Sequence, residues 1–149
     1  MQINLDCLKD VLLYCVDNID YQETDDSWTT KCVNLYMLYD SSELKDYDRK
    51  DIMRSVLKLM ECNFITVSTY FPPNKPYLER CTIDDITMRG YQFINSVKES
   101  SIWEKTKLVA KKTGNHTLSF VEGVAHDIAV EGAKQAISIM MNNGNLPNI

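Results

Sequence analysis

Basic side chains gather in the middle of the chain, where four of them fall within ten residues. They are Arg49, Lys50, Arg54 and Lys58. Guanidinium and ammonium groups bind phosphate oxygens, and arginine also reads the edge of guanine through paired hydrogen bonds. This pattern therefore suggests binding to nucleic acid. The alternative is an ordinary solvated helix face, because four bases over ten residues is only mildly unusual.

Charge is distributed unevenly along the 149 residues, whose net charge is −5. Residues 1–48 hold 11 acids and 3 bases, and residues 113–149 hold 3 acids and 1 base. Residues 49–112 hold 7 acids and 12 bases. We therefore expect a phosphate-binding surface in the central segment, because the acidic N-terminal third repels a polyanion. Asp48 and Asp51 count against this site, since they lie at its phosphate-facing end.

The two histidines give little support for a metal site. Glu122 precedes His126 by four residues, a spacing that supplies only part of a ligand set, and His116 has no ligand type at such a spacing. A solvated helix pair is the favoured interpretation of Glu122 and His126. We expect no bound metal.

The sequence contains no recognisable catalytic arrangement. The neighbouring carboxylates Asp25-Asp26 and Asp84-Asp85 point apart on an extended chain or lie in turns, and no nucleophile stands beside a base. Glycine-rich phosphate loops are absent. We therefore predict a protein that is not an enzyme and needs no cofactor.

Cysteine usage and hydropathy indicate a cytoplasmic protein. The five cysteines form no CxxC pair and are odd in number, so we interpret them as reduced thiols, mostly in the core. They are Cys7, Cys15, Cys32, Cys62 and Cys81. No leader peptide and no membrane-spanning segment are expected.

The central bases lie on a predicted helix that starts after Asp48 and stops at Asn63. Ile52, Val56 and Leu59, with Leu57 and Met60, form one apolar stripe, which leaves most of the bases on the other side. Asp48 is the expected N-cap, and asparagine tolerates the left-handed conformation that ends a helix. Residues 64–67 then read as a strand.

Upstream, we predict a helix over residues 4–18 capped by Asn4, and an acidic loop over residues 21–27. A short strand is expected within residues 28–36. A short helix over residues 38–44, capped by Asp40 or Ser41, precedes the turn 45–47. Such a helix, turn and basic helix constitute a helix-turn-helix.

Downstream, residues 68–77 with their three prolines form an irregular loop, and residues 78–83 form the return strand. Lys75 and Arg80 add positive charge to this wing. Tyr70, Phe71 and Tyr77 flank the prolines, where they either close the hairpin onto the core or stack on a partner.

The C-terminal part is predicted to be helical. Thr87 caps a helix over residues 88–97, and a second helix runs from residue 100 to Lys112, before Gly114. Ser119 and Glu122 fit a capping box for a last helix that ends near Met141. The fold expected is α+β, mainly α: a winged helix-turn-helix over residues 1–98 and a C-terminal helical extension over 99–149, packed on it or used for dimerisation.

The run from Ile86 to Phe120 resembles a family of small phage and prophage proteins from Gram-positive bacteria, known as domain of unknown function twenty-five thirteen. Its pattern is matched at Ile86, Thr87, Gly90, Phe93, Ile94, Ile102, Trp103, Lys105 and Lys107. The chain departs from the pattern at Asn63, where members usually have glycine, and at Met88, Arg89 and Tyr91. The resemblance implies a winged-helix-like fold and a mobile-element setting, but no activity.

Two functions remain open. The first is a dimeric winged-helix protein that binds double-stranded DNA through Arg49, Lys50, Arg54, Lys58, Lys75 and Arg80, and regulates transcription. The second is a module of the same fold that binds a host or phage protein through its acidic N-terminal face. The sequence does not indicate the DNA target, the protein partner or the sign of regulation.

Overall fold

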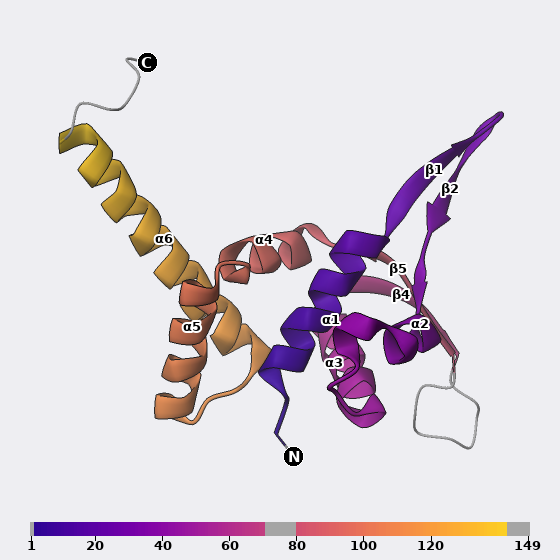
Figure 1. The fold of residues 1–149 in the computed structure, drawn as a ribbon, viewed down its shortest axis with the longest axis horizontal. Coiled ribbons are helices and arrows are strands. Elements are labelled where there is room, and N and C mark those ends of the chain that lie inside the picture. The colour runs from indigo at the N-terminus through magenta and orange to yellow at the C-terminus, as the bar shows by residue number, and fades with distance from the viewer. Residues whose placement is uncertain (1, 71–79, 143–149) are drawn as a thin grey trace. The chain divides into compact units, whose positions relative to one another are not determined.

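The computed structural model describes residues 2–70 and 80–142, and the fold is α+β and mainly helical (Figure 1). The chain divides into two compact units, residues 1–94 and 95–149. Residues 71–79, Lys75 among them, lie outside the described residues, together with the predictions made for them. None of the described helices is both long and apolar enough to cross a membrane.

Helix α1, Leu5–Asn18, begins where the sequence predicts. The Asn4 side chain accepts a hydrogen bond from the backbone N–H of Cys7 at 3.0 Å, as an N-cap does. Its buried residues recur at helical spacing and contribute much of the core of residues 1–94. They are Leu5, Cys7, Leu8, Val11, Leu12 and Cys15.

The loop predicted over residues 21–27 is wrong. Strand β1, Asp20–Thr24, pairs antiparallel with β2, Ser27–Lys31, and only Asp25 and Asp26 connect them. The strands form because tyrosine, threonine and tryptophan favour extended backbone, and this preference outweighs the acidic composition that suggested a loop. Every residue of both strands is exposed, so the hairpin is an arm with no buried side.

A three-stranded antiparallel sheet has the order β3-β5-β4. Its strands are β3, Val33–Asn34, β4, Ile65–Tyr70, and β5, Arg80–Ile86. The predicted strands are present, and the return strand, described from Arg80 on, extends three residues further than expected, to Ile86. One side of this sheet faces the core, and its buried side chains include Val33, Ile65 and Ile83.

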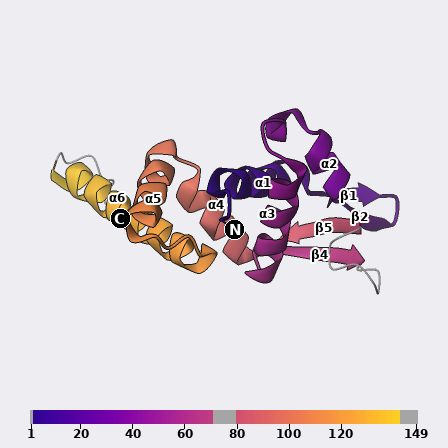
Figure 2. The ribbon, with the colours of Figure 1, turned by 90° about the horizontal axis from the view of Figure 1, so that it is seen from below.

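Three helical segments separate β3 from β4: α2, Leu35–Asp40, the short η1, Ser42–Leu44, and α3, Arg49–Glu61. The single helix predicted over 38–44 is wrong in its start and is divided in two; Ser41, one of the two predicted caps, occupies the N-cap position of η1 but makes no side-chain capping hydrogen bond. Asn34 caps α2, accepting from the N–H of Met37 at 2.8 Å, and Ser41 separates α2 from η1. Figure 2 shows α3 beside α1, with which it packs.

Helix α3 has the predicted start and stop. Asn63 adopts a left-handed conformation with φ 59°, as expected of the residue that ends the helix. Asp48 occupies the N-cap position, but its side chain makes no capping hydrogen bond, contrary to the prediction. The buried side of α3 consists of Ile52, Ser55, Val56 and Leu59, whereas Leu57 and Met60 are half-buried.

Helix α4, Met88–Val97, follows Thr87, and the division between the two units falls within it. In residues 95–149, α5, Ser100–Thr113, ends at Gly114 with φ 69°, as predicted. It packs on α6, Leu118–Asn142. The Ser119 capping box is wrong, because the helix already begins at Leu118 and the N–H of Val121 donates to the carbonyl of Thr117.

All five cysteines are free thiols. Cys7, Cys15 and Cys81 are buried, as predicted for core thiols, while Cys32 and Cys62 are only half-buried.

Candidate functional site

The outward face of α3 carries the first candidate site. One side of α3 packs on the core through Ile52, Val56 and Leu59. At 3.6 residues per turn, Lys50 and Arg54 fall on the opposite side, one turn apart. Lys50 is exposed and Arg54 half-buried. The half-buried side chains of Met53 and Leu57 flank them, so this face is basic with an apolar seam.

Arg49 is exposed at the start of α3 and lies against an aromatic ring. Its guanidinium carbon is 4.9 Å from the centre of the Tyr39 ring, a cation–π contact that connects α3 to α2. Tyr36 meets the same ring edge-on at 6.1 Å. The pKa of Tyr39 is raised by burial, an effect that the charge of Arg49 opposes. The side chain of Arg49 is therefore held in place, and its charge still faces solvent.

Among the described residues, Lys58 is the one of these four bases with an acidic partner. Its Nζ lies 2.8 Å from Oε2 of Glu61, one turn further along α3. The Lys58 side chain is 39% exposed, so the pair is solvated and weak, but it neutralises part of the positive face. The C-terminal turn of α3 is thus less basic than its first two turns.

Arg80 is the first residue of β5, where it pairs with Tyr70 of β4 and is exposed. It therefore lies at the loop end of the hairpin. Lys75 is outside the described residues. The structure places four of the six predicted site residues on one helix and a fifth at the end of the adjacent hairpin.

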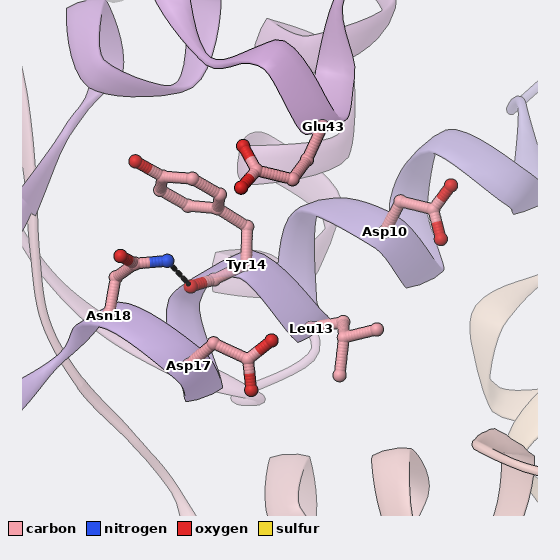
Figure 3. Close-up of a pocket in the computed structure, with 6 residues that line it drawn as sticks. All are labelled: Asp10, Leu13, Tyr14, Asp17, Asn18 and Glu43. Atoms are coloured by element: carbon pink, nitrogen blue, oxygen red, sulfur yellow. Dashed lines mark hydrogen bonds between the residues drawn. The ribbon is translucent and has the colours of Figure 1, made fainter.

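The acidic N-terminal part forms an open groove of about 510 Å³ along α1 and η1 (Figure 3). Its lining residues are Asp10, Leu13, Tyr14, Asp17, Asn18 and Glu43. Tyr47 donates a 2.6 Å hydrogen bond to Asp10, and burial raises the pKa of Tyr14, with a smaller contribution from Glu43. The three carboxylates make this groove unsuitable for a polyanion.

The part of the chain that the structure describes brings no three metal-ligating side chains together. His126 is 70% exposed, and its Nδ1 is 3.6 Å from Oδ1 of Asp127 rather than in a ligand cluster.

The β1–β2 arm was not predicted from the sequence. Tyr21 and Trp28 are 56% and 65% exposed, and the pairing of Glu23 with Trp28 puts both aromatic rings on the same side of the arm. The Tyr21 hydroxyl donates a 2.7 Å hydrogen bond to Asp85, which joins the arm to β5 and raises the pKa of Tyr21. The tyrosine, threonine and tryptophan of residues 21–30, which favour extended backbone, were the signal that could have revealed the strands.

Comparison with known proteins places the chain in one family. The model of the family described as "Hypothetical protein (DUF2513)" matches residues 2–116. This chain belongs to that family. The resemblance found in the sequence is therefore confirmed, although the DUF2513 description assigns no activity. No curated protein and no solved structure matches the chain.

The run Thr87-x-x-Gly90-x-x-Phe93, on which the family resemblance was based, attaches α4 to the corner between α3 and β4. Thr87 Oγ1 donates to the carbonyl of Asn63 at 2.6 Å and accepts from the N–H of Gly90 at 3.1 Å. The Phe93 ring centre lies 5.2 Å from that of Phe64. A Cβ on Gly90 would lie 2.3 Å from the carbonyl oxygen of Phe64, so only glycine fits. These residues hold the fold together.

Arg89, which departs from the DUF2513 pattern, also binds this corner. Its Nη1 donates to the carbonyl of Cys62 at 3.1 Å, and its guanidinium lies 5.3 Å from the centre of the Phe64 ring. This carbonyl ends α3, where positive charge is favourable. Arg89 therefore has a structural role.

Proposed function

We propose that this chain is a non-enzymatic DNA-binding protein with a winged helix-turn-helix fold, which acts as a homodimeric transcriptional regulator of phage or prophage origin. The observation that carries the proposal is the outward, basic face of α3, whose first two turns hold the exposed Arg49 and Lys50 and the half-buried Arg54. The order of α2, η1 and α3, followed by the β4–β5 hairpin, agrees with a recognition helix and a wing.

Each side chain has a distinct role in this proposal. Lys50 and Arg54 project from the face that enters the major groove, where they bind phosphates and base edges. Met53 and Leu57 lie beside them on α3 and suit contact with thymine methyl groups. Arg49, held against Tyr39, binds the phosphate backbone, and Arg80 binds it from the hairpin. Lys58 contributes less, because its ammonium group already forms an ion pair with the carboxylate of Glu61.

The test is fluorescence anisotropy of a labelled random duplex at low salt. The triple variant Arg49→Ala, Lys50→Ala, Arg54→Ala is expected to weaken binding at least tenfold. The matched control, Lys105→Ala, Lys111→Ala, Lys112→Ala, changes the net charge equally by removing exposed bases of α5. It is expected to change binding less than threefold. Equal losses in both variants, or no binding by the unmodified chain, would reject the recognition-helix assignment.

The β1–β2 arm favours a second candidate function, in which the same fold binds a protein. Trp28 is exposed on the arm, and tryptophan is a residue type that often dominates binding energy at interfaces. Glu23 is its cross-strand partner, and Asp25 and Asp26 form the adjacent turn, so the partner would have basic groups beside an apolar pocket. A photo-crosslinking residue at position 30, on the same side of β2 as Trp28, tests this candidate: it is expected to trap a protein that the unmodified chain, but not Trp28→Ala, displaces.

A further inference from the structure

Helix α6 is much longer than α5, the helix on which it packs. It has 25 residues and α5 has 14. All its fully buried residues, Leu118, Val121 and Ala125, lie in its first eight positions. From Val130 to Asn142 every residue is exposed. At 1.5 Å per residue this distal half is about 20 Å long, and no described part of the chain buries it.

The distal half of α6, residues 130–142, is unusually apolar for a helix with no buried side. Five large apolar side chains on it are exposed: Val130, Ile137, Ile139, Met140 and Met141. Glu131 and Lys134 are its only charged residues. A solvated helix normally has a charged face, and large contiguous apolar surfaces of this kind mark contact sites.

Four positions of the distal half recur at intervals of four, three and four residues: Val130, Lys134, Ile137 and Met141. This is the spacing of the a and d positions of a coiled coil, with one lysine at an a position. A single polar a residue fixes the register of a helix pair. Ile139 lies on another side of α6, in line with Leu118, Val121 and Ala125, which face inward.

The surface of this stripe has the shape that a second helix needs. A shallow hollow of about 340 Å³ is lined by Asn142 and by four residues of the stripe side, Lys134, Ile137, Ser138 and Met141. Their spacing, i, i+3, i+4 and i+7, is that of the four residues that form a hole for a side chain of the facing helix. Because an a or d side chain of an identical helix fits such a hole, the stripe is complementary to itself.

We propose that the distal half of α6 pairs with the same half of a second copy of this chain, through Val130, Lys134, Ile137 and Met141. This inference deepens the proposed function by naming the interface of its dimer, but it does not depend on DNA binding. Since only about two heptads take part, the interface is small and the dissociation constant is expected in the micromolar range. The dimer should therefore depend on concentration.

The test is sedimentation velocity of the full chain from 5 to 200 µM, with two matched variants. Ile137→Glu and Ile139→Glu introduce the same charge at exposed isoleucines of one helix, 50% and 60% exposed. Neither change affects a buried site, so both variants should fold, which circular dichroism verifies. The unmodified chain and Ile139→Glu are expected to dimerise, whereas Ile137→Glu should remain monomeric, with at least tenfold weaker association.

Two results would overturn the inference. One is a monomer at 200 µM for the unmodified chain. The other is a dimer that Ile137→Glu leaves intact or that Ile139→Glu disrupts equally. The mass is measured without DNA, so the outcome is separate from that of the DNA proposal. Ile137→Glu retains the α3 face, and a monomer that still binds duplex DNA supports both proposals.

Discussion

At the scale of single residues, the family hallmark has a structural explanation. Thr87, Gly90 and Phe93 were recognised from the sequence as a pattern, but their purpose depends on Asn63 and Phe64, which are more than twenty residues away. No local spacing could show that the Phe64 carbonyl lies against Gly90. The left-handed Asn63 could be predicted, because asparagine before a strand is a helix stop by itself.

Gly90→Ala is expected to destabilise residues 1–94 by about 2–4 kcal/mol, because the added Cβ would meet the Phe64 carbonyl oxygen, which cannot move away cheaply. Urea denaturation measured by circular dichroism checks this value. Gly123→Ala is the control, since a Cβ there meets nothing within 4 Å and alanine favours a helix by about 0.5–1 kcal/mol. Equal effects of the two substitutions would contradict the close approach.

Because three thiols are buried, those of Cys7, Cys15 and Cys81, we expect the free energy of unfolding to fall at alkaline pH. Burial raises the pKa of Cys7 and Cys81 to about 11 and that of Cys15 to about 12, from 9.0. The folded chain therefore keeps its thiols protonated where the unfolded chain ionises. This contribution is complete below about pH 9 and is lost as the pH rises through 11 to 12.

Each thiol should lower the free energy of unfolding by about 1.4 kcal/mol per pH unit above pH 9. Urea denaturation in reductant from pH 8 to 10.5 measures this slope. In Cys15→Ala the slope should be about 1.4 kcal/mol per pH unit smaller, although the variant is less stable at pH 7. An unchanged slope would show that Cys15 is not protected from ionisation.

At the scale of secondary structure, the helices with a long apolar periodicity could be predicted from the sequence, and the short polar strands could not. Helices α1 and α3 bury stripes that span three or more turns, and both were placed within one residue of their observed ends. The β1–β2 arm buries nothing, so it has no apolar alternation to detect. The cap of α2 was missed because Asn34 also ends β3.

Helix caps allow a direct comparison of two residue types that look equivalent in the sequence. Asn4 and Asp48 both precede a helix, but only Asn4 accepts a capping hydrogen bond, 3.0 Å from the N–H of Cys7. Asn4→Ala is expected to cost about 1 kcal/mol of stability, and Asp48→Ala less than about 0.5 kcal/mol. Thermal unfolding of the two variants tests this order, and the reverse order would contradict the observed cap geometry.

At the scale of the whole molecule, charge is separated along the sequence, and its position matters more than its sum. The α1–η1 groove and the β1–β2 arm are acidic, while the first two turns of α3 are basic. This separation could be predicted from the sequence by counting charges in segments. The partners of individual bases could not, because Lys58 meets Glu61 and Arg49 meets Tyr39 only once the helices are formed.

The two proposals together predict how salt weakens DNA binding. Each phosphate neutralised contributes about −0.9 to the slope of log K against log salt. Arg49, Lys50, Arg54 and Arg80 would give about −3.6 for one chain and about −7 for a dimer on two half-sites. Raising salt from 50 to 200 mM should then cost the dimer about 10⁴-fold in affinity and the monomeric Ile137→Glu about 10²-fold.

Lys58→Ala should barely change the slope, since Glu61 already pairs with Lys58, whereas Arg80→Ala should reduce it by about one per chain. Anisotropy titrations at four salt concentrations measure these slopes. Affinities that do not change with salt would mean that the α3 face does not bind phosphates, whatever the oligomeric state.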